Sequence, residues 1–396
     1  MLITAIKIYF QYGKKYLISL LKTFKFSLVN DYINFISKTT IFLSTKHIFE
    51  IDIINLFSSK EVSLKIDIVY TYVDGNDQNW LQKKSFAEDS TNIIEHNAND
   101  SARYMDNEEL KYSLRSIEKY APWINNIFIL TDNQTPAWLN IGNTKIKVID
   151  HKDIFYDKSS LPCFNAKAIE TQIHHIENLS ERFIYFNDDM FLGRLTCPED
   201  FFDKDGKPNI FVSEFFPFPS KKAFDFDKRV DSRKNDYQES VIRSRILYKN
   251  KFNKSIYYNI RHGVKPLLKS VLFKLEKAFA DDVKRTSSSK FRSGNDIMMF
   301  HLCQFYCLHE KLGNPIYLKS VGNSMAIKNI IASVSKNNFA FINLENYALD
   351  SFLHKLQIVK PFVYCLNQTP ATPDSNLILM KSFLELYFPH KSKFEK

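Results

Sequence analysis

The stretch "RFIYFNDDMFLG", residues 182–193, is an apolar run that ends in two adjacent carboxylates. Residues 183–186 carry no charge, and such an unbroken run is typical of a strand covered on both faces of a parallel sheet. Asn187, Asp188 and Asp189 follow directly, and adjacent acids beside a buried strand need a compensating charge. The stretch therefore predicts a buried strand whose carboxyl end carries a charged site.

Similar apolar runs alternate with helical patterns from residue 66 onward. The stretches "IDIVYT" (66–71) and "NIFIL" (126–130) indicate strands, whereas "NEELKYSLRSIEKY" (107–120) and "NAKAIETQIHHIENL" (165–179) have apolar residues at helical spacing. This alternation predicts an α/β fold with a mostly parallel sheet. We expect a main domain over residues 61–385, with a basic helical insert at about 220–290 and a frayed tail at 386–396.

The bulk composition excludes few classes of function. A net charge of +10 is compatible with nucleic acid, an anionic membrane surface or an anionic substrate as partner. The chain contains only nine glycines and neither a GxxxxGK[ST] nor a GxGxxG motif. Its five cysteines form no CxxC pair, and no apolar run is long enough for a transmembrane helix, which favours a cytoplasmic location.

Residues 1–60 form a basic segment that differs from the rest. On a helix, Lys7, Lys14, Lys15, Lys22 and Lys25 would lie within an arc of about 100°. A lysine-bearing face backed by aromatic and aliphatic residues suits the surface of an anionic membrane. A surface helix docked on the main domain explains the pattern equally well.

Acidic residues follow two of the predicted strands. Asp188 and Asp189 end one strand, and Asp74 and Asp77 lie in "YVDGND" after another. Ligands of open α/β sheets bind beyond the carboxyl ends of the strands, and Mg²⁺ is typically held by one or two carboxylates plus substrate phosphates. The pattern favours a metal site, although a turn residue followed by a cap would also explain the Asp188–Asp189 pair.

Other polar residues have ordinary explanations when taken singly. Asp106 and Glu109 match a D-x-x-E capping pattern, and Glu170 lies on the polar side of an amphipathic helix. His262 and Arg292 are isolated residues in basic loops.

Four longer strings resemble the conserved regions of the Stealth family. They are "IDIVYTYVDGND", "RYMDNEELKYSLRSIEKYAPWINNIFILTDNQTPAWL", "AIETQIHHIENLSERFIYFNDDMFLG" and "KFRSGND". The resemblance spans roughly residues 66–350 and implies a fold similar to nucleotide-sugar glycosyltransferases of the GT-A or Rossmann-like type. It also implies transfer of a whole sugar 1-phosphate from a nucleotide sugar, with release of a nucleoside monophosphate.

The resemblance also assigns residues. Glu170, Asp189, His262 and Arg292 match the family's active-site residues, and Asn187 and Asp188 accompany Asp189. Asp74, Arg103, Asn107 and Arg115 would hold the nucleotide and its phosphates. Asp188 and Asp189 would bind Mg²⁺ (or Mn²⁺), and either Glu170 or His262 would accept the proton of the acceptor hydroxyl. The chain departs from the family where Gly263 and Val264 follow His262 in place of x-Pro.

We therefore expect a hexose 1-phosphate transferase, with an N-acetylhexosamine from a UDP-sugar, UDP-GlcNAc above all, as donor. The acceptor would be a growing capsular polysaccharide, and the partners would be the inner face of the cell membrane and the capsule assembly machinery. An ordinary metal-dependent glycosyltransferase, which releases a nucleoside diphosphate, is the alternative enzyme. A nucleic-acid-binding protein is disfavoured because the chain has no RNP-like, helix-turn-helix or zinc signature.

Overall fold

A computed structural model of the chain describes residues 64–396, except 92–93, 95–99, 214–235, 256 and 322–334. The basic segment at residues 1–60 lies outside the described residues. Residues Val62–Lys396 form one compact unit. Within the described part of the chain, no helix is long and apolar enough to cross a bilayer.

The main sheet has the strand order β3-β2-β1-β4-β7. Strands β1 to β4 are all parallel, and only β7 runs antiparallel, along the edge of β4. The predicted α/β class with a mostly parallel sheet is thus confirmed. The bounds are β1 (Ile66–Thr71), β2 (Ile127–Thr131), β3 (Ile146–Asp150), β4 (Arg182–Asn187) and β7 (Lys265–Leu268).

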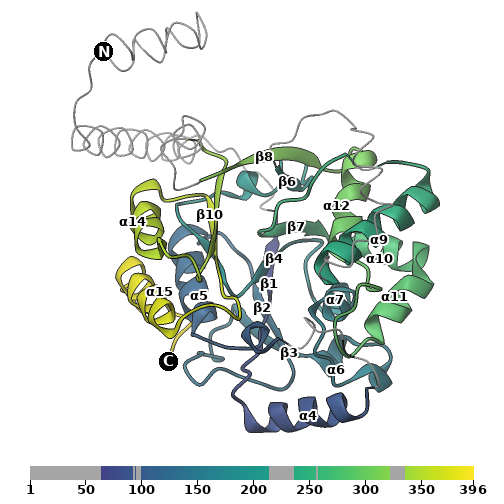
Figure 1. Ribbon diagram of the computed structural model, residues 1–396. Helices are drawn as coiled ribbons and strands as arrows, with labels where there is room; N and C mark the ends of the chain where they lie inside the picture. Colours follow the sequence, from purple (N-terminus) through teal and green to yellow (C-terminus); the bar gives the residue numbers. More distant parts are fainter. Residues whose placement is uncertain (1–63, 92–93, 95–99, 214–235, 256, 322–334) are drawn as a thin grey trace, which may run out of the picture. The chain divides into compact units, whose positions relative to one another are not determined.

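Alternate residues of these strands enter two different apolar cores. Val69 and Tyr185 pack on the face covered by helices α7, α10 and α12, whereas Ile68 and Phe186 pack on the face covered by helix α5. Both faces of the strands are thus buried, which explains their uninterrupted apolar runs. Figure 1 shows these helices on opposite sides of the main sheet. The described helices are α4 (Gln78–Asp89), α5 (Glu109–Tyr120), α6 (His151–Ile154), α7 (Ala166–Glu170), α9 (Asp236–Phe252), α10 (Lys269–Ala278), α11 (Ala280–Ser287), α12 (Met299–His309), α14 (Leu349–Val359) and α15 (Asp374–Tyr387).

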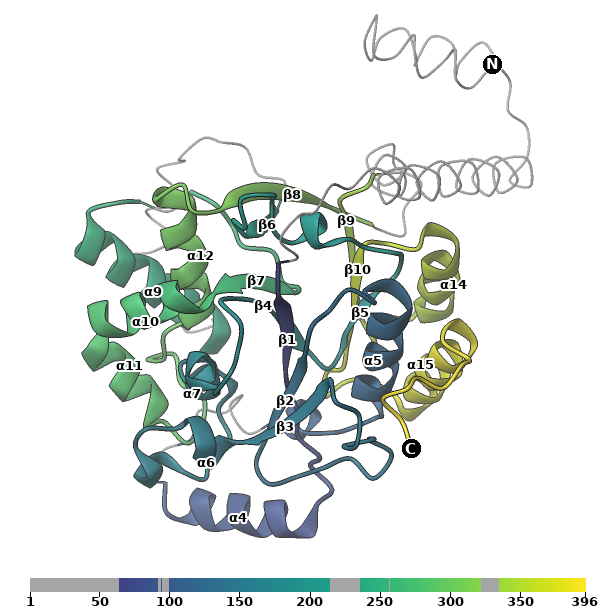
Figure 2. The same ribbon diagram turned by 180° about the vertical axis from the view of Figure 1, so that it is seen from behind.

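The chain after β4 contributes all five strands of a second sheet, in the order β5-β10-β9-β8-β6. Its bounds are β5 (Met190–Leu192), β6 (Asn209–Ser213), β8 (Asn314–Ser320), β9 (Asn338–Asn343) and β10 (Val363–Asn367). One side of this sheet contributes to the core under α5, and the other packs against α14 and α15. Figure 2 shows β5 and β10 beside α5. Asp188 and Asp189 are therefore the link between the two sheets.

Two expectations about local structure are wrong. The helix expected at 165–179 ends with α7, and a 3₁₀ turn at Ile173–His175 follows, although Ile173 still reaches the core. The tail expected to fray is packed: Phe394 is 2% exposed, Glu395 forms an antiparallel bridge with Leu139, and the Lys396 amide donates to the Trp138 carbonyl at 2.8 Å. A buried phenylalanine near the end of the chain holds the tail in place.

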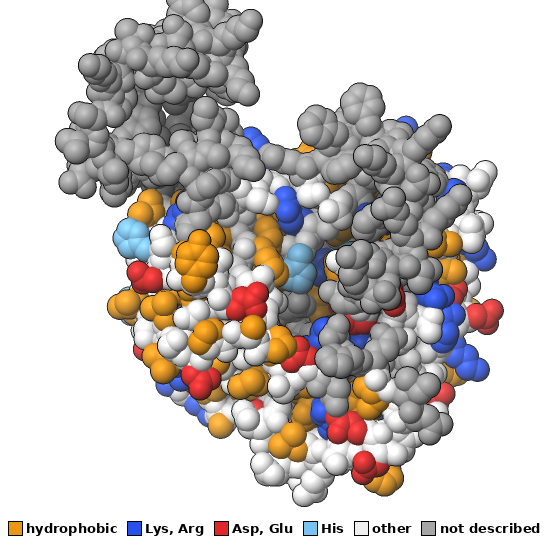
Figure 3. Space-filling model, viewed as in Figure 1, with side chains coloured by type: hydrophobic (Ala, Val, Ile, Leu, Met, Phe, Trp, Pro, Cys, Tyr) orange, Lys and Arg blue, Asp and Glu red, His pale blue; other side chains and the backbone are white. Residues whose placement is uncertain are grey.

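Charges of both signs share the surface of the described residues. On the face drawn in Figure 3, Lys and Arg side chains are interspersed with Asp and Glu. Among the described residues visible on this face, Lys and Arg side chains do not form the continuous basic stripe that marks many nucleic-acid-binding proteins.

Candidate functional site

Asp188 and Asp189 form the link between β4 and β5, and contacts with β10 hold Asp189 in place. The Asp189 carbonyl accepts from the Leu366 amide of β10 at 3.1 Å, and Asp189 Oδ2 accepts from Cys365 Sγ at 3.1 Å. Asp189 Oδ1 is buried without a hydrogen-bond partner among the described residues. One oxygen of this carboxylate is therefore held in place while the other remains available for a ligand.

The carboxyl groups of both aspartates are buried, and Asp188 also lies among other acids. Burial raises the pKa of Asp189 to about 6. The pKa of Asp188 rises well above its ordinary value because of burial and of the neighbouring charges of Asp189, Glu109 and Asp106. Such shifts mean that ionising both groups costs free energy that a bound cation would offset.

The loop after β1 places further acids at the same edge. Gly75 donates to the Tyr104 carbonyl at 2.7 Å, and a Cβ on Gly75 would lie 2.3 Å from that oxygen, so only glycine fits here. This contact fastens the Asp74 loop to the segment that carries Arg103. The Tyr72 hydroxyl donates to Asp106 at 2.7 Å, and the pKa of Tyr72 is raised by burial and by Asp106, Asp74 and Asp188.

Glu109 belongs to this acidic group and is not a capping residue. Helix α5 begins after Glu108, which makes no side-chain cap, so Asp106 and Glu109 do not form the predicted D-x-x-E capping box. Asp106 Oδ1 instead accepts from the Glu108 amide at 2.8 Å. The Glu109 carboxylate accepts from the Asn107 amide at 2.6 Å and from Asn107 Nδ2 at 2.8 Å. Burial nevertheless raises the pKa of Glu109 to about 7.

A group of cations lies beside Glu170. Arg103 and Lys167 share the buried carboxylate of Asp236, at 3.4 and 3.1 Å. The pKa of Arg103 is lowered by burial and by the charge of Arg292, so these two guanidinium groups are neighbours. The Nε atoms of both arginines are buried and have no hydrogen-bond partner in the described part of the chain. Two neighbouring guanidinium groups that each have a buried Nε–H donor without a partner are suited to binding a phosphate group.

Glu170 and Asp189 have Lys265 as a common neighbour. Lys265 pairs across β7 with Tyr185 of β4, and its Nζ lies 5.2 Å from the centroid of the Tyr185 ring. Burial lowers the pKa of Lys265, whereas Glu170 and Asp189 raise it. Burial raises the pKa of Glu170, which Lys265 and Arg292 in turn lower. Sequence reasoning missed Lys265, although a lysine opening the apolar strand "KPLL" was a usable signal.

His262 lies next to this lysine. Its ring stands edge-on to Phe341, with centroids 5.1 Å apart, and burial together with Lys265 lowers its pKa to about 4. His262 is therefore neutral at physiological pH, and its Nε2 has no hydrogen-bond partner among the residues described. Sequence reasoning also did not single out His301 of α12. Burial, together with the charges of Lys265, Arg245 and His262, lowers its pKa to about 3.

The remaining predicted residues divide into two groups. Asn107, which bonds to Glu109 and Gln368, and Asn187, paired in register with Thr71, lie at the strand-end edge. Asp77 instead caps α4 by accepting from the Asn79 and Trp80 amides at 2.8 and 3.1 Å. Arg115 is bound by both oxygens of Glu395 at 2.8 and 2.6 Å. The structure gives Asp77 and Arg115 structural contacts and leaves neither side chain directed to the site.

A metal ion at Asp188 and Asp189 would be coordinated by few protein ligands. Among the described residues, His174, His175 and Glu276 are the group of His, Cys, Asp or Glu that places three ligand atoms within 4.8 Å of one another. Asp188 and Asp189 are not part of it. They fit a cation that takes one or two carboxylates and completes its shell with phosphate and water, as Mg²⁺ does.

Fold and site together define an α/β protein in which the carboxyl end of β4 carries two buried aspartates, Asp188 and Asp189, with the buried cation Lys265 as a neighbour of Asp189. Two family models match the chain: Stealth conserved region 2 over residues 103–210 and Stealth conserved region 3 over residues 261–309. The chain belongs to the Stealth family, as its motifs predicted. The two matched regions contain Glu170, Asp189, His262 and Arg292.

Curated relatives carry related names. An exopolysaccharide phosphotransferase of Streptomyces coelicolor is 35% identical over 84% of this chain and 51% of its own length. The exopolysaccharide phosphotransferase CpsY of Mycobacterium leprae is 32% identical over 85% of this chain and 58% of its own length. The chain thus spans about half the length of these relatives.

A solved structure shows a loose likeness. A galactosyltransferase, LgtC, in complex with donor and acceptor sugar analogues, matches 82% of this chain and 96% of its own at 13% identity and a TM-score of 0.38.

Proposed function

We propose that this chain transfers a sugar 1-phosphate from a nucleotide sugar to a hydroxyl of a growing exopolysaccharide. The observation that carries the proposal is that one buried lysine, Lys265, is a common neighbour of Glu170 and Asp189, while the charge of Arg292 also acts on Glu170. These residues are far apart in the sequence, and their charges suit a reacting phosphoryl group. The names of the Stealth relatives support the same chemistry.

The reaction forms one bond to phosphorus and breaks another. The acceptor oxygen attacks the phosphorus that bears the sugar, the bond from that phosphorus to the bridging oxygen breaks, and nucleoside monophosphate leaves with that oxygen. Negative charge on the phosphoryl oxygens would be met by the Nε–H groups of Arg103 and Arg292, which have no other described partner. Positioned donors of this kind stabilise the transition state more than the ground state.

The acceptor proton requires a base, and we assign this role to His262. It is neutral because its pKa is about 4, and its Nε2 is free to accept. Glu170 also has a buried oxygen, Oε2, without a partner among the described residues, but its carboxylate lies among the charges of Lys265, Arg292 and Lys167, which it can neutralise. Glu170 would instead hold the cations in position.

Asp188 and Asp189 would hold the metal. The unpartnered Oδ1 of Asp189 and the raised pKa values of both carboxyls fit a divalent cation. When bound, Mg²⁺ or Mn²⁺ would neutralise charge on the donor phosphates.

The finer features of the reaction follow from the family pattern. We propose UDP-GlcNAc as donor and a capsular polysaccharide as acceptor, with turnover at the inner face of the cell membrane beside the capsule assembly machinery. Residues 61–385 would form the catalytic domain, in which the stretch at about 220–290 contributes α9, α10, α11 and the edge strand β7.

Product analysis tests the proposal. Purified protein, Mg²⁺, a phosphodiester-linked oligosaccharide and a panel of nucleotide sugars should yield nucleoside monophosphate and a new phosphodiester signal in the phosphorus NMR spectrum. Release of nucleoside diphosphate would instead make the protein an ordinary glycosyltransferase.

A matched pair of variants ties that chemistry to the site. Asp189→Asn should lower turnover by at least about 100-fold because it removes charge where the phosphates bind. Asp77→Asn should keep turnover because asparagine caps a helix as well as aspartate does. Near-wild-type turnover of Asp189→Asn would overturn the site assignment.

A further inference from the structure

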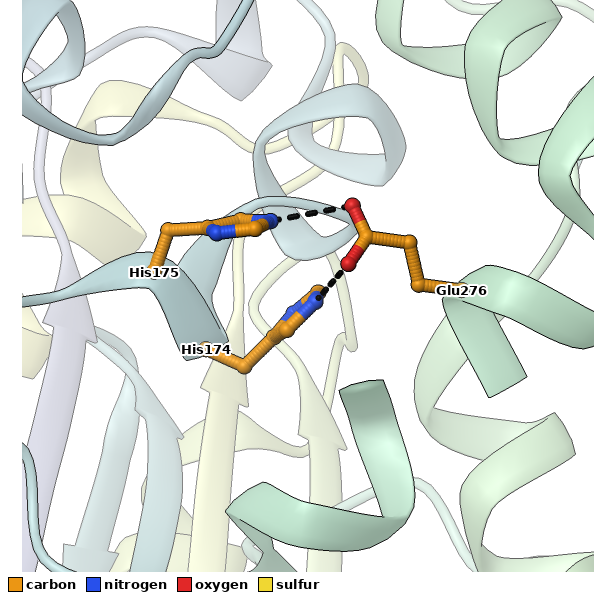
Figure 4. A group of neighbouring side chains, drawn as sticks. All are labelled: His174, His175 and Glu276. Carbon is orange, nitrogen blue, oxygen red and sulfur yellow. Dashed lines mark hydrogen bonds and ion pairs between the residues drawn. The ribbon is translucent and has the colours of Figure 1, made fainter. Parts of the chain in front are cut away.

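Two adjacent histidines face one carboxylate outside the proposed active site (Figure 4). His174 and His175 lie in the 3₁₀ turn after α7, and Glu276 lies on α10. The Nε2 atoms of His174 and His175 are each 3.0 Å from a different oxygen of Glu276. The three side chains thus place two imidazole nitrogens and a carboxylate oxygen within 4.8 Å of one another.

We propose that His174, His175 and Glu276 bind a zinc ion that joins the turn after α7 to α10. Two imidazole nitrogens and one carboxylate are a common ligand set for Zn²⁺, with bonds of about 2.0–2.1 Å. Ligand atoms on a tetrahedral ion at that radius are about 3.3 Å apart. The observed nitrogen–oxygen distances of 3.0 Å therefore need an adjustment of only a few tenths of an ångström. Imidazole ligands also favour zinc over magnesium or calcium.

The surroundings hold the rings in the orientation that this requires. Phe273, one turn before Glu276 on α10, packs edge-on against both imidazoles, with centroids 4.6 and 5.3 Å away. The imidazole centroids lie 4.3 Å apart. Because the rings are braced from one side, little conformational entropy would be lost on binding an ion.

The cluster is buried on one side and reached by solvent on the other. The His174 side chain is fully buried, whereas those of His175 and Glu276 are 25% and 27% exposed. A water from the solvent side can therefore occupy the fourth position. The ion would have a structural role, because its ligands do not include the residues proposed to act on substrate.

The competing arrangement is a hydrogen-bonded clamp without an ion, in which each imidazole donates its Nε2–H to Glu276. The clamp and the zinc site predict different responses to added metal. The proposal does not depend on the proposed transferase activity, since its readouts are metal binding and thermal stability.

The experiment uses tag-free full-length protein, stripped with a chelator and titrated with Zn²⁺ in excess Mg²⁺. We expect one tight site per chain, a Zn²⁺-dependent rise in Tm, and the visible absorption of tetrahedral Co²⁺ when cobalt replaces zinc. His175→Ala and Glu276→Gln should each weaken zinc binding by more than about 100-fold, since even the loss of an outer-shell partner costs 10–100-fold.

Two control variants separate this site from others. His390→Ala removes an exposed histidine elsewhere and should bind zinc normally. Asp189→Asn should also bind zinc normally, which distinguishes the cluster from the acidic strand ends. Absence of saturable binding, or binding that both His175→Ala and Glu276→Gln retain, would overturn the proposal in favour of the clamp.

Discussion

Among single residues, Lys265 has the environment that most needs a functional explanation. A buried lysine is costly unless paired, and this one has its pKa lowered by burial and raised by Glu170 and Asp189. Lys265→Met keeps the length of the side chain and removes its charge. We expect turnover to fall by about 10²–10³-fold because an electrostatic partner of the phosphoryl site is lost.

Stability should fall as well. Lys265→Met leaves the buried carboxyls of Glu170 and Asp189 without their common cation, so the urea midpoint should be lower than that of the wild type. Lys277→Met, at an exposed position of α10, serves as the matched control for both measurements. A variant with normal turnover would show that Lys265 only neutralises its neighbours.

His301 provides a pH-dependent test at the residue scale. Burial lowers its pKa from 6.5 to about 3, so the folded chain keeps it neutral while the unfolded chain protonates it below pH 6.5. The stability that it contributes is complete above pH 6.5 and is lost as the pH falls toward 3. Between pH 7 and 5 this loss amounts to about 2 kcal/mol.

The measurement compares urea unfolding at the two pH values. His301→Gln, which cannot titrate, should lose about 2 kcal/mol less than the wild type over this interval. His390→Gln, at an exposed site, should retain the full loss. Equal losses in all three proteins would mean that His301 is already protonated, or accessible to protons, in the folded chain.

Among the elements, β4 and the acids after it could be predicted because the signal is local. An apolar run that ends in two aspartates is visible within twelve residues. The second sheet could not be predicted in the same way, since β5 has three residues and pairs with β10, far along the chain. The arrangement around Lys265 likewise depends on β7 pairing with β4, which no local pattern encodes.

The C-terminal tail shows how a distant partner changes the role of a residue. Arg115 of α5 resembles a family residue for phosphate binding, but its partner Glu395 lies 280 positions away. The pair is nearly buried, with 12% and 4% of the side chains exposed, and Arg115 also donates to the Phe388 carbonyl at 2.7 Å. The ion pair therefore docks the tail on α5.

Arg115→Ala should destabilise the fold without impairing donor binding. Removing one partner of a buried pair leaves the other charge unpaired, which costs about 3 kcal/mol. Urea unfolding should show this loss, and Glu395→Ala should add little to it in a double-mutant cycle. The KM for the nucleotide sugar should stay within about twofold, so a much larger rise would restore Arg115 to the phosphate site.

At the scale of the whole molecule, the chain has a net charge of +10 and divides into two units, Met1–Glu61 and Val62–Lys396. We assign catalysis and membrane binding to different units. The proposed catalytic residues all belong to that unit, whereas the lysines of the first 26 residues lie outside it. We propose that the N-terminal segment associates with anionic membrane, as its lysine pattern predicts. Each lysine near such a surface contributes about 1 kcal/mol at physiological ionic strength.

Deletion of residues 1–26 should weaken membrane binding and leave turnover intact. Turnover on a soluble acceptor should persist, because the compact unit keeps its residues, while sedimentation with phosphatidylserine vesicles should fall. Sedimentation with these vesicles should fall equally when glutamine replaces five lysines, which are Lys7, Lys14, Lys15, Lys22 and Lys25. Vesicles of neutral lipid should bind neither the wild type nor the deleted form. Because exposed charges are screened beyond about 8 Å at 0.15 M salt, added salt should release the wild type from the vesicles. If the deleted form still sediments with anionic vesicles, the membrane contact lies within the compact unit. If the deleted form loses turnover, residues 1–26 stabilise the catalytic domain instead.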